Sequence, residues 1–231
     1  VTTISPTMSG PSSSRWAPKP PPVKAFNSPV VKVSVGEPPK LFDIHKGLLI
    51  HYSIYFRSAY NGNWAVSNES IHRLEDEDAE IFQMFYTWLY NGQRLHPPGE
   101  DFDLDKLPLM LCGVWVFGDK RGVVGLKNTA MESLTSTFEQ VDNLPEPSTL
   151  CYIYDNTSES SSLRKFFVHL VAINAERQDF SIAAFLKDGK REDSLPVEFG
   201  YDLAIALAEV AAVEQPEWFL DPGWEGYFDK S

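Results

Sequence analysis

Cysteine is scarce in this sequence, with two residues among 231, and long apolar runs are missing. Two cysteines cannot build the disulfide framework that supports many secreted domains, so reduced thiols in a reducing compartment are expected. The longest apolar stretch, Leu203–Val213, is interrupted by Glu209 and is too short to span a bilayer. The first residues do not form a charged segment followed by an apolar one, as a secretory signal would. We therefore expect an intracellular protein, in the cytoplasm, the nucleus or both, without a membrane partner.

The motifs of catalysis and metal binding are also missing. The sequence has no phosphate-binding glycine loop and no nucleophile elbow, and its five histidines and two cysteines lack the spacing of metal ligands. Asp101, Asp103 and Asp105 imitate the start of a calcium loop. The sixth position is Lys106 instead of glycine, however, and the twelfth is Cys112 instead of glutamate. We expect no catalytic residue, no cofactor and no bound metal ion, and hence no enzyme.

Positive charge is in short supply, with 20 Lys and Arg against 32 Asp and Glu and a formal net charge of −12. A chain this acidic repels phosphate backbones, so nucleic acid is a poor partner for its folded part. A hydrophobic content of 43% with 13% aromatic residues supports a real core, so disorder of the whole chain is excluded.

What the sequence does contain is a fixed order of secondary-structure patterns. Val30–Val35 and Lys40–Ile44 have the character of two strands joined by a turn at Gly36–Pro39. Further patterns follow in this order: a helical one from His45 to Phe56 that Asn61-Gly62 ends, a strand at Glu69–Leu74, and helices at Ile81–Tyr90, Leu107–Lys120 and Val123–Leu134. Strands of one small sheet followed by a run of helices predict an α+β fold, with the helices packed against the sheet.

The segments on either side of this region differ in composition. Residues 1–29 are rich in Pro and Ser, so we expect a flexible tail whose deletion leaves the stability unchanged, although Pro18–Pro22 could also be a ligand for an aromatic groove. Pro145 and Pro147 mark a second boundary. Helical patterns recur after it, at Thr149–Tyr154, Leu163–Asn174 (with Arg164 and Lys165 outside), Phe180–Leu186 and Gly200–Val213. The aromatic, acidic segment 216–231 either docks back on these helices or is a short motif read by a partner.

The helix at Ile81–Tyr90 has almost no polar face, so it must be buried on more than one side. One side belongs to the core of its own domain, and the other needs either the C-terminal helices or a second protein. Because this chain supplies extra helices, cover from within the chain is the expected arrangement. Acidic residues at Glu75–Asp78 stand where the helix begins, and Asp76 or Asp78 can cap it.

With these residues in view, Val30–Leu134 resembles a BTB/POZ domain. The resemblance is carried by three stretches in the family's order: Phe42–Leu49 with Tyr52-Ser53-x-Tyr55-Phe56, then Ile71–Phe82 with Trp88–Gly92, then Val116–Gly122 before a helix with Leu126, Asn128 and Ala130. The stretch from Tyr152 to Lys165 is similar to the helical extension common in fungal BTB/POZ proteins. The resemblance implies a small three-stranded sheet flanked by a helical cluster at 30–137, a helical extension at 145–215, and tails at 1–29 and 216–231.

The same resemblance implies function through protein–protein association. Two activities are implied, self-association through the first helices and the bridging of a cullin-type ubiquitin-ligase scaffold to a substrate. Alternatives are a transcription-associated or structural scaffold subunit and, from another class, an enzyme with an unrecognised site. The candidate interaction residues lie in the first helices and in the aromatic helix: Leu49, Ile54, Phe56, Met84, Tyr86 and Trp88. Leu48, Tyr52, Tyr55 and Phe56 form an inward stripe, with Leu49 and Ile54 nearer its flanks, which predicts a monomer or a weak homodimer.

Overall fold

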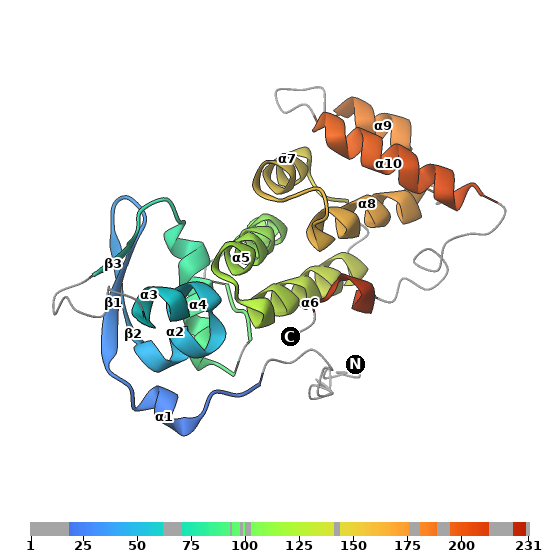
Figure 1. Cartoon of the computed structure of the whole chain (residues 1–231). Helices are drawn as coiled ribbons and strands as arrows, with labels where there is room; N and C mark the ends of the chain where they lie inside the picture. Colours follow the sequence, from blue (N-terminus) through green and yellow to red (C-terminus); the bar gives the residue numbers. More distant parts are fainter. Residues whose placement is uncertain are drawn as a thin grey trace, which may run out of the picture.

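The computed structural model describes residues 19–61, 71–92, 94–97, 99, 103–140, 144–175, 181–188, 195–212 and 224–229. It confirms the α+β prediction, with a small sheet and its helices at one end and a helical extension at the other (Figure 1). The strands are β1 (Val30–Val35), β2 (Lys40–His45) and β3 (His72–Leu74). The helices are α1 (Val23–Phe26), α2 (Lys46–Tyr52), α3 (Ile54–Asn61), α4 (Ala79–Tyr90), η2 (Leu104–Lys106), α5 (Leu107–Arg121), α6 (Val124–Gln140), α7 (Pro147–Asn156), α8 (Ser162–Ala175), α9 (Ile182–Asp188), α10 (Val197–Val210) and η3 (Trp224–Tyr227). Glu69 and Ser70 of the predicted third strand lie outside the described residues.

β1 is the central strand of the sheet, between β2 and β3. It pairs antiparallel with β2 and parallel with β3. A parallel pair of strands requires a crossover connection. The chain passes from β1 to its parallel neighbour β3 through β2, α2 and α3. Val33 and Val35 of β1 and Phe42 and Ile44 of β2 are buried at alternate positions, so one face of the sheet carries the core.

The aromatic helix α4 is held at its start by Asp78, one of the two predicted caps. The Asp78 carboxylate accepts hydrogen bonds from the backbone amides of Glu80 and Ile81 at 2.6 and 3.1 Å. The buried side chains of α4 are Phe82, Met84, Phe85, Trp88 and Leu89. Such a helix needs cover on two sides, as its sequence predicted.

The cover of α4 comes from within the chain, as expected. It is supplied by α5 and α6, however, and not mainly by the C-terminal helices. The rings of Phe82 and Phe85 lie 5.7 and 5.1 Å from the ring of Phe117 on α5. The indole nitrogen of Trp88 donates to the Thr129 hydroxyl on α6 at 3.1 Å. The C-terminal helices therefore pack on α5 and α6, which already shield α4.

α5 is the central helix of the molecule and is buried around its whole circumference over Leu111–Gly118. It contacts α4, α6 and α7 on different sides (Figure 1). Gly113 allows the closest approach, since a Cβ there would lie 2.4 Å from Cδ1 of Ile81 on α4 and 3.5 Å from the Tyr152 hydroxyl on α7. The helix ends where Gly122 takes the left-handed conformation, with φ 61°.

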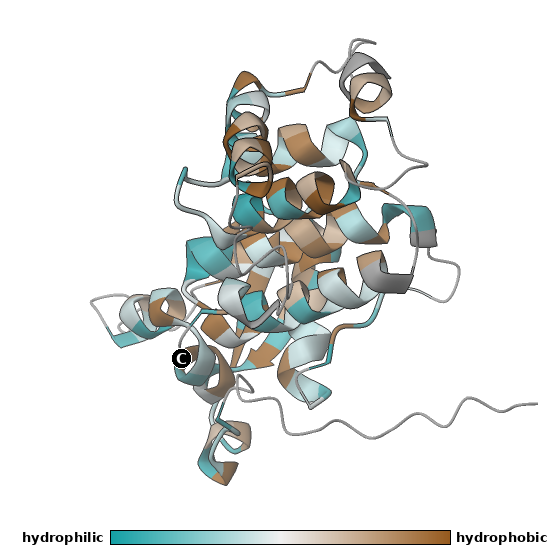
Figure 2. Ribbon diagram, turned by 90° about the vertical axis from the view of Figure 1, so that its right-hand side faces the viewer, coloured by the Kyte–Doolittle hydropathy of each residue, from teal (hydrophilic) through white to brown (hydrophobic). Residues whose placement is uncertain are grey.

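The helical extension packs on the far side of α5 and α6. The Phe138 ring of α6 lies 6.3 and 5.5 Å from the rings of Phe166 and Phe167 on α8, and α10 packs against α8 in turn. Figure 2 shows the most hydrophobic positions concentrated in the stacked helices at the middle of the molecule. Among the described helices, none combines the length and apolarity that crossing a membrane would require.

Arg164, at the start of α8, corrects the sequence prediction that placed it on the outer face. It is 8% exposed, and its guanidinium lies 4.2 Å from the ring centroid of Tyr154 on α7. Nη2 donates to the Tyr154 carbonyl at 2.6 Å, and Nε donates to the Thr157 hydroxyl at 2.9 Å. The carboxyl end of α7 thus supplies acceptors that a helical repeat in α8 cannot reveal.

The predicted flexible tail is wrong for the residues directly before β1. α1 packs on α2, and Ala25 within it is 5% exposed. The Ser28 hydroxyl donates to the Ala25 carbonyl and accepts from the Gly47 amide, both at 2.7 Å. Residues 1–18 of the predicted tail lie outside the described residues. The packing depends on Gly47, because a Cβ there would lie 2.7 Å from Cα and from the carbonyl oxygen of Ala25.

This close approach predicts a change of sign for one substitution. In the whole chain, Gly47→Ala should lower the free energy of unfolding by about 1–3 kcal/mol, because the methyl group collides with α1. In a chain without residues 1–28 the same change should raise it by about 0.5–1 kcal/mol, because alanine favours a helix over glycine. Urea unfolding of the four proteins measures both values, and the same sign in both backgrounds would contradict the packing of α1.

Candidate protein-interaction surface

The first helices meet at a corner that turns a large apolar side chain outward. Ser53 separates α2 from α3, with an extended backbone at φ −118° and ψ 125°. Its hydroxyl accepts from the Phe56 amide at 3.1 Å, which caps α3, and donates to the Arg121 carbonyl at 2.6 Å. Ile54, the first residue of α3, is 61% exposed as a result.

The six predicted interaction residues fall into three environments. Four are fully buried in the core of the chain: Leu49, Phe56, Met84 and Trp88. Tyr86 is half-buried, with its ring 5.6 Å from that of Phe42, and Ile54 is exposed. The expectation that Leu49 lies at a flank is corrected, because the break at Ser53 gives α2 and α3 separate inward faces. The interaction role stays a prediction, and the side chains that can reach a partner without rearrangement are Ile54 and Tyr86.

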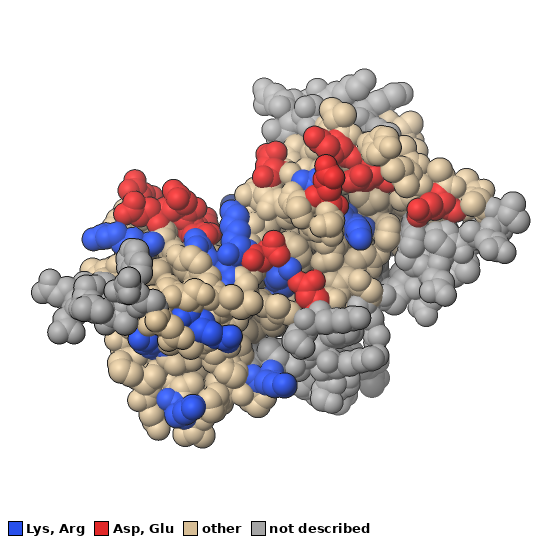
Figure 3. Space-filling view, in the orientation of Figure 1, with Lys and Arg blue, Asp and Glu red and all other residues tan. Residues whose placement is uncertain are grey.

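Two further apolar side chains are exposed on α1, Val23 at 77% and Phe26 at 41%. We call Val23, Lys24, Phe26, Ile54 and Arg57 the α1–α3 face. A pocket of about 400 Å³ opens within it, lined by Pro22, Lys24, Ala25, Gly47, Ile50, His51 and Arg57. The pocket lining carries cationic groups and no carboxylate. Figure 3 shows isolated Lys and Arg side chains on the lower part of this half of the molecule, whereas acidic side chains gather along its upper edge.

Arg57 is fixed in this face by the end of α2. Its Nε donates to the Ile50 carbonyl at 3.0 Å, and its Nη2 donates to the His51 carbonyl at 3.1 Å. These are carbonyls that the last turn of a helix leaves without an intrahelical partner. The positive charge therefore has a defined position beside the pocket, which makes the face a rigid target for a partner.

Behind the α1–α3 face, Arg121 joins three elements of the domain. Its Nη2 forms an ion pair with Oε1 of Glu77 at 2.6 Å, and the two side chains are 17% and 12% exposed. The same guanidinium lies 4.3 Å from the ring centroid of Tyr55 on α3. The Tyr55 hydroxyl lies 3.1 Å from Nε2 of His72 on β3. This cluster holds α3, and with it the corner at Ile54, against the end of α5.

Two titratable groups packed beside this ion pair, His72 and Tyr60, are uncharged near pH 7. Burial, assisted by the charge of Arg121, lowers the pKa of His72 below its usual value. Burial raises the pKa of Tyr60 to about 12. A neutral histidine and a protonated tyrosine inside the core support the fold, and they do not form an accessible acid–base pair. Within the described ranges, no group of three His, Cys, Asp or Glu side chains could hold a metal ion.

Comparison with protein families agrees with this geometry. The family model of the BTB/POZ domain matches residues 31–102, which run from β1 to the segment before α5. The chain therefore contains a BTB/POZ domain, a protein-interaction module, followed by a helical extension. No curated protein gives a significant match to the sequence.

Sequence reasoning missed the contribution of α1 to this surface. Pro22 directly precedes α1 as its N-cap residue, with φ −66° and ψ 148°, and Val23 and Phe26 stand one turn apart in the helix. A proline before a four-residue turn is a weak helix signal inside a Pro-rich stretch. The contact with Gly47 that stabilises α1 is a tertiary one, so it has no sequence signal of its own.

Proposed function

We propose that this chain is a protein-interaction adaptor and that its BTB/POZ domain associates through the α1–α3 face. The observation that carries the proposal is the exposure of Ile54 at the start of α3 in that domain, and of Val23 and Phe26 on α1, which directly precedes it. Burial of each is worth about 1.5–3 kcal/mol, whereas association costs several kcal/mol in lost freedom and side-chain ordering. The face therefore favours weak self-association and leaves room for exchange with other protein partners.

Self-association can be tested by placing a charge on this face. Ile54→Asp should abolish any concentration-dependent dimer, because the carboxylate would have to be desolvated in the interface. Ile205→Asp on α10 is the matched control, since Ile205 is 45% exposed at the other end of the molecule. Sedimentation velocity over a wide concentration range measures both variants. Loss of association with Ile205→Asp alone would move the interface to α10, and a dimer that persists at nanomolar concentration would contradict weak association.

The family supports a second part of the proposal, in which the adaptor bridges a cullin-type ubiquitin-ligase scaffold to a substrate inside the cell. Affinity purification from native cells tests it by showing whether a cullin co-elutes. Co-elution of a transcriptional complex instead would favour the scaffold alternative. In either case Ile54→Asp and Ile205→Asp separate partners of the α1–α3 face from partners of the extension.

A further inference from the structure

A short segment near the end of the chain lies against α6 and α8, outside the part of the chain that matches the BTB/POZ family. η3 and the residues after it contact both helices (Figure 1). Tyr227 is 8% exposed, and its ring lies edge-on to that of Phe166 on α8, with 5.7 Å between centroids. This agrees with the interpretation that the aromatic segment docks back, for residues 224–229. The form of the contact is that of a bound peptide.

Asn128 on α6 provides the first peptide-like contact. Its Nδ2 donates to the Asp229 carbonyl at 2.9 Å, and its Oδ1 accepts from the Asp229 amide at 2.9 Å. Both groups belong to the backbone of one residue, so the side-chain amide recognises an extended strand whatever its sequence. Asn128 is 5% exposed, and without such a strand its amide would be left with these two hydrogen bonds unmade.

Lys127 provides the second contact, to the acidic side chain. Its ammonium forms an ion pair with the Asp229 carboxylate and another with Asp119 at 2.6 Å, and it lies 4.4 Å from the ring centroid of Trp115. Burial alone lowers the pKa of Lys127, but the hydrogen bonds and charges of both carboxylates outweigh it and raise the pKa. A pocket of about 160 Å³ opens beside this ion pair, with a wall that includes Ser158, Ser160, Ser161 and Ser162. The Asp229 carboxylate can thus be approached from solvent.

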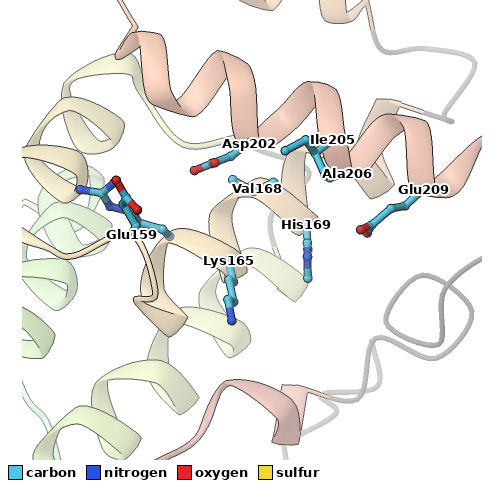
Figure 4. Close-up of a pocket in the computed structure, with 9 residues that line it drawn as sticks. Glu159, Lys165, Val168, His169, Asp202, Ile205, Ala206 and Glu209 are labelled. Atoms are coloured by element: carbon cyan, nitrogen blue, oxygen red, sulfur yellow. The ribbon is translucent and has the colours of Figure 1, made fainter.

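His169 on α8 provides the third contact, to the tyrosine. Its Nδ1 is hydrogen-bonded to the Tyr227 hydroxyl. Burial lowers the pKa of His169 to about 4 and raises that of Tyr227, so the bond joins two neutral groups at pH 7. Figure 4 shows His169 and Lys165 extending from α8 on the side away from Asp202 of α10. His169 also lines the pocket of about 170 Å³ between α8 and α10, so the tyrosine contact lies at the border of that pocket.

We propose that the surface of α6 and α8 covered by residues 227–229 is a recognition site for an extended protein segment with a tyrosine two residues before an aspartate. Residues 227–229 are then its resident ligand, and a partner carrying a Tyr-x-Asp segment binds by replacing them. In this site Asn128 binds the backbone of the segment, Lys127 binds its aspartate carboxylate, and His169 binds its tyrosine hydroxyl. The site lies outside the BTB/POZ match and does not depend on the α1–α3 face. The proposal of a peptide site can therefore fail without affecting the proposal of association through the α1–α3 face, and the reverse also holds.

The test uses the full chain with Tyr227→Ala and Asp229→Ala together, the emptied variant, which removes from the site the two side chains that it recognises. The probe is a fluorescent peptide with the sequence of residues 224–231, and anisotropy measures its binding. The emptied variant should bind the peptide, and the unaltered chain should bind it at least about tenfold more weakly, because its own segment competes at high effective concentration. Adding Asn128→Ala should lower the affinity about tenfold, since two hydrogen bonds are lost.

Matched controls define the site. Asn156→Ala, which removes an amide bonded to the Tyr152 carbonyl on α7, and Ile54→Asp should leave peptide binding unchanged. Peptides with Ala in place of Tyr, or Asn in place of Asp, should bind several-fold more weakly than the parent. No binding to the emptied variant, or equal binding after Asn128→Ala, would overturn the proposal.

A second measurement uses the unaltered chain, so that the test does not depend on the folding of the emptied variant. Hydrogen exchange followed by mass spectrometry reports the protection of the backbone amides of residues 227–229. Excess peptide should displace the resident segment and speed this exchange, whereas the Tyr-to-Ala peptide should not. Exchange that stays the same at the highest peptide concentration, with either peptide, would refute a replaceable ligand and leave the segment as a fixed part of the fold.

Discussion

Removal of residues 144–231 should make the remaining chain aggregate, although it keeps the whole BTB/POZ match. The cause lies in α5, which is buried on all sides over Leu111–Gly118 and depends on α7 for one of them. Without the extension that side of α5 faces water, and so does Phe138 of α6, which contacts two phenylalanines of α8. An apolar patch of this kind on a small protein leads to association.

Gel filtration and binding of an apolar dye measure this effect, with the whole chain as reference. Leu150→Ala and Ile153→Ala in the whole chain provide a graded version, because both side chains are fully buried on α7. Each should lower the free energy of unfolding by about 2–5 kcal/mol. A monodisperse, stable fragment that ends before residue 144 would show that the domain closes its core without the extension.

Arg121→Ala should cost about 3–5 kcal/mol of unfolding free energy, more than an exposed cation contributes. The change leaves the Glu77 carboxylate, 12% exposed, without its partner at 2.6 Å, and it removes the cation above the Tyr55 ring. Lys120→Ala, at the exposed neighbouring position, is the control and should change stability by less than about 0.5 kcal/mol.

Two additional measurements separate charge from packing in this cluster. Glu77→Gln should recover part of the loss in the Arg121→Ala background, since it removes the uncompensated charge, and the double-mutant cycle gives the coupling energy. The pKa of His72 should rise in Arg121→Ala, because the positive charge that helps to lower it is gone. NMR titration measures that pKa. A coupling energy near zero together with an unchanged pKa of His72 would show that Arg121 acts only through its aliphatic stem.

Local patterns were sufficient for the order and type of the elements. The aromatic helix predicted at Ile81–Tyr90 is α4, which begins two residues earlier because Asp78 caps it. The helix predicted to end at Leu134 is less accurate, since α6 continues to Gln140. The added turn contains Thr135, whose hydroxyl bonds the Glu132 carbonyl, and its Phe138 packs on α8. Tertiary packing thus extends a helix where propensity is weak.

The candidate interaction residues were harder to predict, because exposure depends on which helix faces which. Periodicity in the first helices assumes a regular continuation, and the extended backbone at Ser53 divides it. Leu49 is buried for that reason, while Ile54 stands outside at the start of α3. Met84 and Trp88 are apolar positions of a helix that needed cover, and the cover is intramolecular.

By itself, the sequence determined the α+β class, the BTB/POZ resemblance and the presence of a helical extension, because these depend on the spacing of apolar residues along one segment at a time. The tertiary structure alone decided three other features. These are the packing of α1 on Gly47, the burial of Arg164 against the end of α7, and the peptide-like seat of Asp229 on Asn128. In each of them, backbone groups of one segment contact a residue of another segment, either through its side chain or, at Gly47, because it has none. Such contacts have no periodicity to read, since they depend on distances that exist only after the chain has folded.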